Sequence, residues 1–268
     1  MLKTRVTVSA VLVPIVIAIV WFGEPWFPIL VAVWGSVAAW EFYRLVARNK
    51  TPVIIYFGII WSLLFMLSPY YDYSFTLPAL LTSATVLPLI FLLFRRNKEQ
   101  AFSGWVWTIA GIVYIGWLLS YWVELRGPLD GRNWVFLGLF VTFASDSAAY
   151  FIGRQWGKHY LAPAVSPKKT WEGAAAGVVG AIIVSLLFRL PTPLQLPFNW
   201  WQAAVLGVLI SVFGQLGDLA KSLFKRNMGV KDSSNLIPGH GGFLDRIDSI
   251  VFAGIVVYYY VIWLSPIH

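Results

Sequence analysis

Residues 217–248 read GDLAKSLFKRNMGVKDSSNLIPGHGGFLDRID, a polar stretch between two strongly apolar ones. Before it comes WWQAAVLGVLISVFGQL (200–216), and after it comes SIVFAGIVVYYYVIWL (249–264). The polar stretch holds four of the chain's 12 acidic residues, namely Asp218, Asp232, Asp245 and Asp248. Charges next to membrane-spanning segments persist where they face protein, water or a ligand. Carboxylates among lysines, arginines and glycines suit a metal ion with phosphates, so we predict that this stretch is the reaction centre.

The composition is that of a membrane protein. Of the 268 residues, 59% are hydrophobic and 12% are charged, and the mean hydropathy is +0.72. Soluble domains are about one quarter charged, and no polar block here is long enough to form one. The chain has no cysteine, which excludes disulfides, thiolate catalysis and cysteine metal sites. The start, MLKTR followed by apolar residues, resembles a signal peptide, but we expect a retained first helix because no clean cleavage site follows.

The predicted fold class is an all-α polytopic membrane protein with about nine transmembrane helices. A spanning helix needs about 20 mostly apolar residues. Continuous apolar runs favour helices over a barrel, whose strands alternate apolar and polar residues. We expect a single membrane domain, with N-terminal helices in 1–130 and a catalytic region in 131–268. The expected spans are 6–22, 27–46, 53–70, 75–94, 102–123, 134–153, 174–190, 200–220 and 249–265.

The placement of lysine and arginine predicts a cytoplasmic N-terminus and an external C-terminus. With this orientation, 17 of the 20 basic residues are cytoplasmic, and only Arg126, Arg132 and Arg189 are external. The net charge of +8 then reflects topology and attraction to anionic headgroups, and we expect no nucleic-acid partner. The predicted location is the inner (cytoplasmic) cell membrane, with the active site on the cytoplasmic side.

Three aspartates, Asp218, Asp245 and Asp248, are the predicted metal ligands. Asp245 and Asp248 are three residues apart, so they share one face of a helix, and they also complement the positive end of its dipole. Capping explains one of them, and an ion pair with Lys221 or Lys225 is the alternative explanation for Asp218. A third carboxylate from another helix favours a divalent cation. Mg²⁺ prefers oxygen and commonly binds between one or two carboxylates and substrate phosphates.

The sequence PGHGGF (238–243) permits two interpretations. His240 fits a turn residue that satisfies backbone groups, or a phosphate donor or partner of the metal ligands. Gly241 and Gly242 permit positive φ and expose amides, so they are candidates for an anion-binding concavity ahead of a helix. The segment is not a P-loop, because the GK[ST] ending is absent.

A second polar block surrounds residues 145–173. Asp146 lies inside a predicted membrane helix, where a functional role is the default hypothesis. Lys168 and Lys169 fit either a positive-inside anchor or neutralisation of a triphosphate. Glu172 fits a capping-box acid or a dipole partner at the start of the next span.

These blocks resemble the phosphatidate cytidylyltransferase family, also called CDP-diacylglycerol synthases. The resemblance rests on SLFKR (222–226), KD (231–232) and HGGFLDRID (240–248), with SDSAAYFIGR (145–154) and SPKKTWEG (166–173) upstream. The first 130 residues add only hydropathy to the match. The resemblance implies transfer from CTP to phosphatidate, giving CDP-diacylglycerol and pyrophosphate with Mg²⁺ as one or two metal ions at one site, and a homodimer.

The resemblance also implies roles for individual residues. Asp218, Asp245 and Asp248 would hold the metal, and Asp232 would orient Lys231 or assist the metal. A phosphomonoester is largely ionised at pH 7, so His240 is not needed as a base. The residues implied to neutralise phosphates are Lys225, Arg226, Lys231 and Arg246. Lys168 and Lys169 would form a second layer of positive charge around the phosphates.

Two other function classes remain open at this point. A CTP-dependent lipid-alcohol kinase would use the same residue types with a different acceptor. A membrane transporter of phosphorylated solutes would spread intramembrane charges along several spans, whereas here they gather at the cytoplasmic ends of a few.

Overall fold

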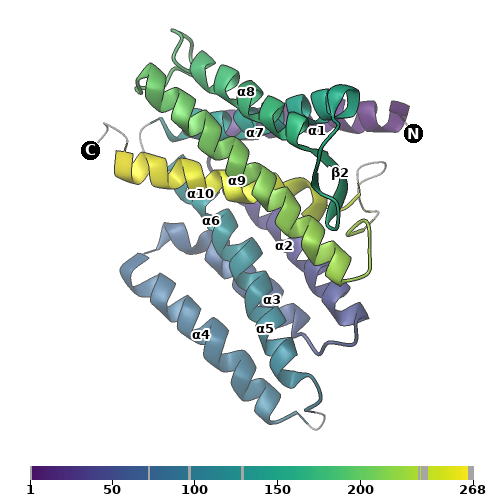
Figure 1. The fold of residues 1–268 in the computed structure, drawn as a ribbon. Helices are drawn as coiled ribbons and strands as arrows, with labels where there is room; N and C mark the ends of the chain where they lie inside the picture. Colours follow the sequence, from purple (N-terminus) through teal and green to yellow (C-terminus); the bar gives the residue numbers. More distant parts are fainter. Residues whose placement is uncertain are drawn as a thin grey trace. The chain divides into compact units, whose positions relative to one another are not determined.

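The computed structural model describes residues 2–71, 73–95, 98–127, 130–234, 236 and 241–264, with only the backbone described for residues 2–9, 73 and 264. This described part is mostly helical (Figure 1). In chain order its elements are α1 (Leu2–Phe22), α2 (Trp26–Arg48), α3 (Ile55–Leu67), η1 (Ser68–Tyr70), α4 (Tyr73–Leu93), α5 (Ala101–Gly111), η2 (Ile112–Trp117), α6 (Leu118–Arg126), α7 (Gly131–Trp156), β1 (Tyr160–Ala162), β2 (Ser166–Thr170), α8 (Trp171–Leu187), α9 (Trp200–Asn227) and α10 (Leu244–Leu264).

Each predicted span coincides with one of these helical stretches, although the ends differ. α5, the π-helical turn η2 and α6 form one continuous helix, Ala101–Arg126. Within the described residues, six helices are long and apolar enough to cross a membrane. The shorter apolar helices there are Ala10–Phe22, Ile55–Tyr70 and Trp171–Leu187. The helical membrane architecture is therefore confirmed, while the count of nine crossings and the orientation of the termini stay predictions.

The chain folds as two compact units. Unit 1 comprises Met1–Glu124 and Met228–Asp245, and unit 2 comprises Leu125–Asn227 and Arg246–His268. The expected division into N-terminal helices (1–130) and a catalytic region (131–268) stays a prediction. The segment Met228–Asp245, however, belongs to unit 1, so the polar stretch 217–248 is divided between the two units.

Unit 1 packs around a buried tyrosine of α2. Tyr43 is fully buried, and its hydroxyl donates a hydrogen bond to the carbonyl oxygen of Thr108 at 2.8 Å. Gly58 of α3 and Gly111 of α5 lie directly against its ring, where a Cβ would overlap the ring atoms. Small residues let helices approach this closely inside a membrane, so these two glycines determine how α3 and α5 pack on α2.

Unit 2 is built on α7, α8 and α9, with α8 packed on both of the others. The α8–α9 contact is close because a Cβ at Gly207 would come within 2.9 Å of the Ile182 backbone. α10 approaches α9 in the same way, since a Cβ at Gly217 would lie 2.5 Å from the carbonyl oxygen of Asp248. These close approaches bring polar side chains of α7, α9 and α10 into one region.

The loop between α7 and α8 contains a short hairpin that the all-α prediction lacks. β1 and β2 are antiparallel, with Tyr160 opposite Thr170 and Ala162 opposite Ser166. Strands this short carry too little apolar alternation to be recognised in a sequence. The hairpin fixes the backbone of 166–170, the part that carries the predicted phosphate-binding lysines.

The start of α8 corrects one expectation. Thr170 caps the helix, because its hydroxyl accepts from the amide of Gly173 at 3.2 Å. Glu172 is not a capping-box acid: its carboxylate accepts from the amides of Lys158 and His159 and meets His159 Nδ1 at 2.6 Å. Glu172 lies one residue too early for a capping box. Its own amide and His159 lower the pKa of Glu172 to about 2, so the carboxylate at this helix end stays ionised.

Candidate active site

Five charged side chains of unit 2 form what we call the ion cluster: Asp146, Lys169, Asp218, Lys221 and Asp248. Lys169 Nζ lies 2.7 Å from Asp218 Oδ2, and Lys221 Nζ lies 3.1 Å from Asp218 Oδ1. Lys221 also forms an ion pair with Asp248. Asp146 interacts electrostatically with Asp218 and with both lysines, and it accepts a hydrogen bond from Ser249. Side chains from α7, β2, α9 and α10 thus meet at one place.

The ion cluster is graded from buried to exposed. The side chains of Lys221 and Asp248 are 8% and 10% exposed, whereas those of Lys169 and Asp218 are 24% and 29% exposed. Buried charges are stable only when they are paired and hydrogen-bonded, which explains why Lys221 contacts two carboxylates. With three acids and two lysines, the ion cluster has a formal charge of −1. A net negative charge favours a cation, and the ammonium group of Lys169 lies at the more exposed side of the ion cluster.

Hydrogen bonds between helices fix the backbone around the ion cluster. Ser145 of α7 and Ser211 of α9 bond through their hydroxyls at 2.7 Å. The side-chain amide of Gln215 donates to the Ser211 hydroxyl at 3.0 Å and to the Ala174 carbonyl oxygen of α8 at 3.2 Å. Asp218 follows Gln215 by one helical turn. Its position therefore depends on the contacts that hold α7, α8 and α9 together.

The structure brings four predicted site residues of unit 2 together, namely Asp146, Lys169, Asp218 and Asp248. The basic residues at the ends of these elements are more open. Arg226, in the last turn of α9, donates from Nε to the carbonyl oxygen of Val165 at 3.2 Å. Lys168, Arg226 and Arg246 are exposed, and Lys225 is half-buried. Their predicted role with phosphates stays a prediction.

The predicted site residues of unit 1 lie in the segment Met228–Asp245. Lys231 and Asp232 are exposed. Asp245 Oδ2 accepts from the amides of Ser233 at 3.0 Å and Gly242 at 3.2 Å. Gly241 has a φ of +82°, a conformation that favours glycine. His240 and Gly239 lie outside the described residues.

The amides near the glycines are bonded to carboxylates of the protein itself. Gly242 donates to Asp245, while Phe243 and Leu244 donate to Glu41 of α2 at 3.0 and 2.9 Å. A Cβ at Gly242 would overlap the Ser233 hydroxyl and the Glu41 carboxylate. Glycine at 242 is therefore required for this close approach, and the anion-binding role expected for Gly241 and Gly242 stays a prediction.

Comparison with known proteins identifies the family. A model of the cytidylyltransferase family matches residues 3–264. The chain belongs to this family. It is 33% identical over 264 residues to a phosphatidate cytidylyltransferase of Bacillus subtilis (strain 168), covering 96% of this chain and 97% of that protein. The match to the phosphatidate cytidylyltransferase of Brucella suis biovar 1 (strain 1330) is 36% over 263 residues, covering 96% and 92%.

A relative from a plant has the same percentage of identical residues as the Brucella protein. Phosphatidate cytidylyltransferase 5, chloroplastic, of Arabidopsis thaliana is 36% identical over 290 residues, covering 97% of this chain and 71% of that protein. The family resemblance found in the two polar blocks is thus confirmed and extends over almost the whole chain, including the first 130 residues.

Nucleotidyl transfer generally uses a divalent metal, and the ion cluster of this family member fits one in part. Asp218 and Asp248 provide the carboxylate oxygens that Mg²⁺ prefers. The ammonium group of Lys221 forms ion pairs with both carboxylates, so the two lie close together. Among the described residues, no group of three or more His, Asp or Glu side chains could hold a metal ion. Two carboxylates still suit Mg²⁺, which commonly completes its shell with water and substrate phosphates. The three-aspartate site stays a prediction.

Sequence reasoning missed Glu41 and underestimated Lys221. Glu41 is the one acidic residue in the apolar run 27–46, and its side chain is buried. An acid inside a span is itself a signal of function, so the sequence did contain the clue. Lys221 was considered only as a partner of Asp218, whereas it also binds Asp248.

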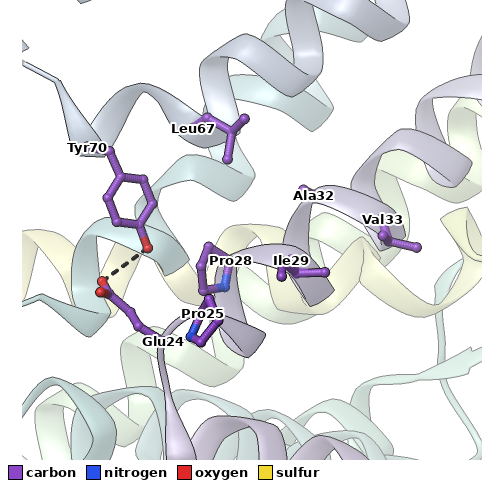
Figure 2. A pocket seen from close by; sticks show the side chains of 8 residues that line it. All are labelled: Glu24, Pro25, Pro28, Ile29, Ala32, Val33, Leu67 and Tyr70. Atoms are coloured by element: carbon purple, nitrogen blue, oxygen red, sulfur yellow. Dashed lines mark hydrogen bonds between the residues drawn. The ribbon is translucent and has the colours of Figure 1, made fainter.

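A separate cavity lies in unit 1 between the start of α2 and the end of α3 (Figure 2). Its volume is about 430 Å³. Tyr70 donates a hydrogen bond to Glu24 Oε1 at 3.1 Å on one side of it. None of the predicted site residues lines this mainly apolar cavity, so it is distinct from the ion cluster. The lining residues are Glu24, Pro25, Pro28, Ile29, Ala32, Val33, Leu67 and Tyr70.

Proposed function

We propose that this protein transfers the cytidylyl group of CTP to phosphatidate at the cytoplasmic face of the inner membrane, giving CDP-diacylglycerol and pyrophosphate. One observation carries the proposal: relatives that match nearly the entire chain bear the name phosphatidate cytidylyltransferase. The ion cluster supports it, because Asp146, Lys169 and Asp248 lie in the sequence runs that carry the family resemblance.

The proposed reaction is an in-line displacement. A phosphate oxygen of phosphatidate forms a bond to the α-phosphorus of CTP while the bond to the bridging oxygen of the β-phosphate breaks. Pyrophosphate takes that electron pair. A phosphomonoester is mostly ionised near pH 7, so the attack needs no strong base. The work left to the protein is positioning and charge stabilisation.

The charged residues have distinct roles in this proposal. Asp218, Asp245 and Asp248 would hold Mg²⁺, which supplies charge stabilisation to the phosphates when bound. Lys169, at the open side of the ion cluster, would bind phosphate together with Lys168. The remaining phosphate-neutralising residues are Lys225, Arg226, Lys231 and Arg246, with Asp232 orienting Lys231.

Labelled CTP tests the reaction. Purified protein with phosphatidate, Mg²⁺ and CTP labelled in the cytidine should give labelled lipid and one pyrophosphate for each CDP-lipid. A parallel sample with CTP labelled at the γ-phosphate should give no labelled lipid; lipid labelled in this sample alone would instead show a lipid kinase. Transport of phosphorylated solutes without any labelled lipid would overturn the proposal in favour of a transporter.

We also propose a cytoplasmic N-terminus, nine crossings and a homodimer. Single cysteines can be introduced freely because the chain has none. A cysteine at Val230 should react only in inverted vesicles, and one at Asp130 only from outside intact cells. Labelling of both from the same side would contradict the orientation, and the mass of the purified protein in a native membrane disc tests the dimer.

The basic residues at the end of α9 should affect substrate use. Lys225→Ala and Arg226→Ala should each lower kcat/KM for CTP by about 10- to 100-fold, because they remove charge stabilisation. Arg44→Ala is the matched control: Arg44 stacks over the Trp40 ring at 4.8 Å, so its loss should change expression or stability and leave kcat/KM unchanged. Equal losses of specific activity in all three variants would refute these roles.

A further inference from the structure

One face of α2 holds the segment Met228–Asp245 of unit 1. Trp34, Glu41 and Asn49, the residue that follows the helix, recur about two helical turns apart and therefore lie on the same side. The rings of Trp34 and Phe243 meet edge to face at 5.4 Å and 76°. Asn49 Nδ2 donates to Met228 Sδ at 3.3 Å. Glu41 lies between Trp34 and Asn49 on the helix and also contacts this segment.

The carboxylate of Glu41 accepts four hydrogen bonds. Ser233 Oγ donates to Oε2 at 2.9 Å, and Ser234 Oγ donates to Oε1 at 2.5 Å. The Phe243 amide donates to Oε1 and the Leu244 amide to Oε2. Each oxygen therefore takes one hydroxyl and one amide, so both oxygens of this 1%-exposed side chain have hydrogen-bond partners although water does not reach them. This single side chain therefore joins residues 233–234 to residues 243–244.

Glu41 is linked to a predicted metal ligand through one hydroxyl. Ser233 Oγ lies 2.9 Å from Glu41 Oε2 and 2.9 Å from Asp245 Oδ2. A serine hydroxyl has one proton, so it serves one carboxylate at a time. The Ser233 amide donates to Asp245 as well, so the position of Asp245 follows that of Ser233.

We propose that Glu41 is a positioning residue for cytidylyl transfer. It fixes Ser233 and the first turn of α10, and through them it sets the orientation of the Asp245 carboxylate. This role rests on the proposed function, because positioning has meaning only for a reaction in which Asp245 takes part. Glu41 itself is buried, so it would not touch the substrate and would affect Asp245 through Ser233.

A structural role alone would predict a different pattern of effects. Tyr43, two residues further along α2, also makes a buried hydrogen bond, to Thr108. It contacts α3 and α5 rather than the segment Met228–Asp245. Tyr43→Phe therefore removes one buried bond from the same helix without changing the surroundings of Asp245, which makes it the matched control.

Glu41→Gln is the direct test. Glutamine offers one acceptor oxygen and an NH₂ group that would face donors, so it cannot accept all four bonds. We expect kcat to fall about tenfold or more, as when a partner that orients a ligand is lost. The Mg²⁺ concentration for half-maximal activity should rise. Amide hydrogen exchange at Phe243 and Leu244 should become faster, a readout that needs no activity.

Tyr43→Phe should lower the melting temperature while leaving kcat, the Mg²⁺ dependence and exchange at these amides unchanged. Ser234→Ala removes one of the four bonds and provides a milder variant if Glu41→Gln does not fold; it should shift the same three readouts less. Normal kcat and normal exchange in Glu41→Gln or Ser234→Ala would overturn the proposal. A wild-type protein that makes no CDP-lipid would instead refute the proposed function. Amide exchange does not depend on activity, so it would still show whether Glu41 fixes Phe243 and Leu244.

Discussion

Asp218→Asn and Asp248→Asn are each expected to lower kcat by at least about 10²-fold while the protein remains folded, because each removes a charged oxygen ligand of the proposed metal. Asn has nearly the shape of Asp, and it also caps helices well. If these residues only stabilised helix ends, the change would cost a few tenths to about 1 kcal/mol of stability and leave kcat intact. Asp245→Asn should behave in the same way if all three aspartates bind one metal.

Steady-state kinetics over a range of Mg²⁺ and Mn²⁺ concentrations, with melting curves on the same samples, would measure these effects. High metal concentrations should partly restore the weaker variants. Asp130→Asn is a suitable control, because Asp130 is exposed with a φ of +62°, which asparagine also tolerates. Wild-type kcat in the Asp218 and Asp248 variants at every metal concentration would exclude the metal site.

Lys221→Met should destabilise the metal-free protein by about 3 kcal/mol, because removing one partner of a buried ion pair leaves an uncompensated charge. Lys221 contacts both Asp218 and Asp248, and its loss leaves the two carboxylates repelling each other. A bound divalent cation would offset this repulsion. Mg²⁺ should therefore raise the melting temperature of Lys221→Met more than that of the wild type.

Melting curves in EDTA and in excess Mg²⁺ check this expectation. Lys98→Met, which removes an exposed lysine, should leave both melting temperatures close to those of the wild type. An equal Mg²⁺ effect in Lys221→Met and the wild type would mean that the cation does not bind near Asp218 and Asp248.

The helices could be predicted because each apolar run is long enough to form one in lipid, where the backbone must satisfy its own hydrogen bonds. The hairpin β1–β2 could not, since its strands have three and five residues and are held by local backbone bonds. The π-helical turn Ile112–Trp117 also leaves no trace in the apolar pattern. The periodicity of apolar residues predicts regular helices and strands but does not predict such short or irregular elements.

The candidate site was predicted in its residue types and only partly in its pairings. Asp218 and Asp248 could be selected because charges beside apolar spans are rare. That Lys169 approaches Asp218 depends on how β2 packs in unit 2, a tertiary contact that the spacing in the sequence does not contain. Glu41 is recognisable as an acid inside a span, but the sequence does not show what it contacts, because its partners are nearly 200 residues away along the chain.

That separation has a consequence for how the protein is made. Ser233 follows Glu41 by 192 residues, and a ribosome adds about 5–20 residues per second, so α2 is complete roughly 10–40 s before its partner segment exists. During this time a newly inserted α2 carries a carboxylate without the donors that later surround it, at a cost of a few kcal/mol in the bilayer. A nascent chain that stops before residue 228 keeps that acidic group uncovered. Unfinished chains therefore expose the Glu41 carboxylate in their second helix, whereas in finished chains the donors of residues 233–234 and 243–244 cover it.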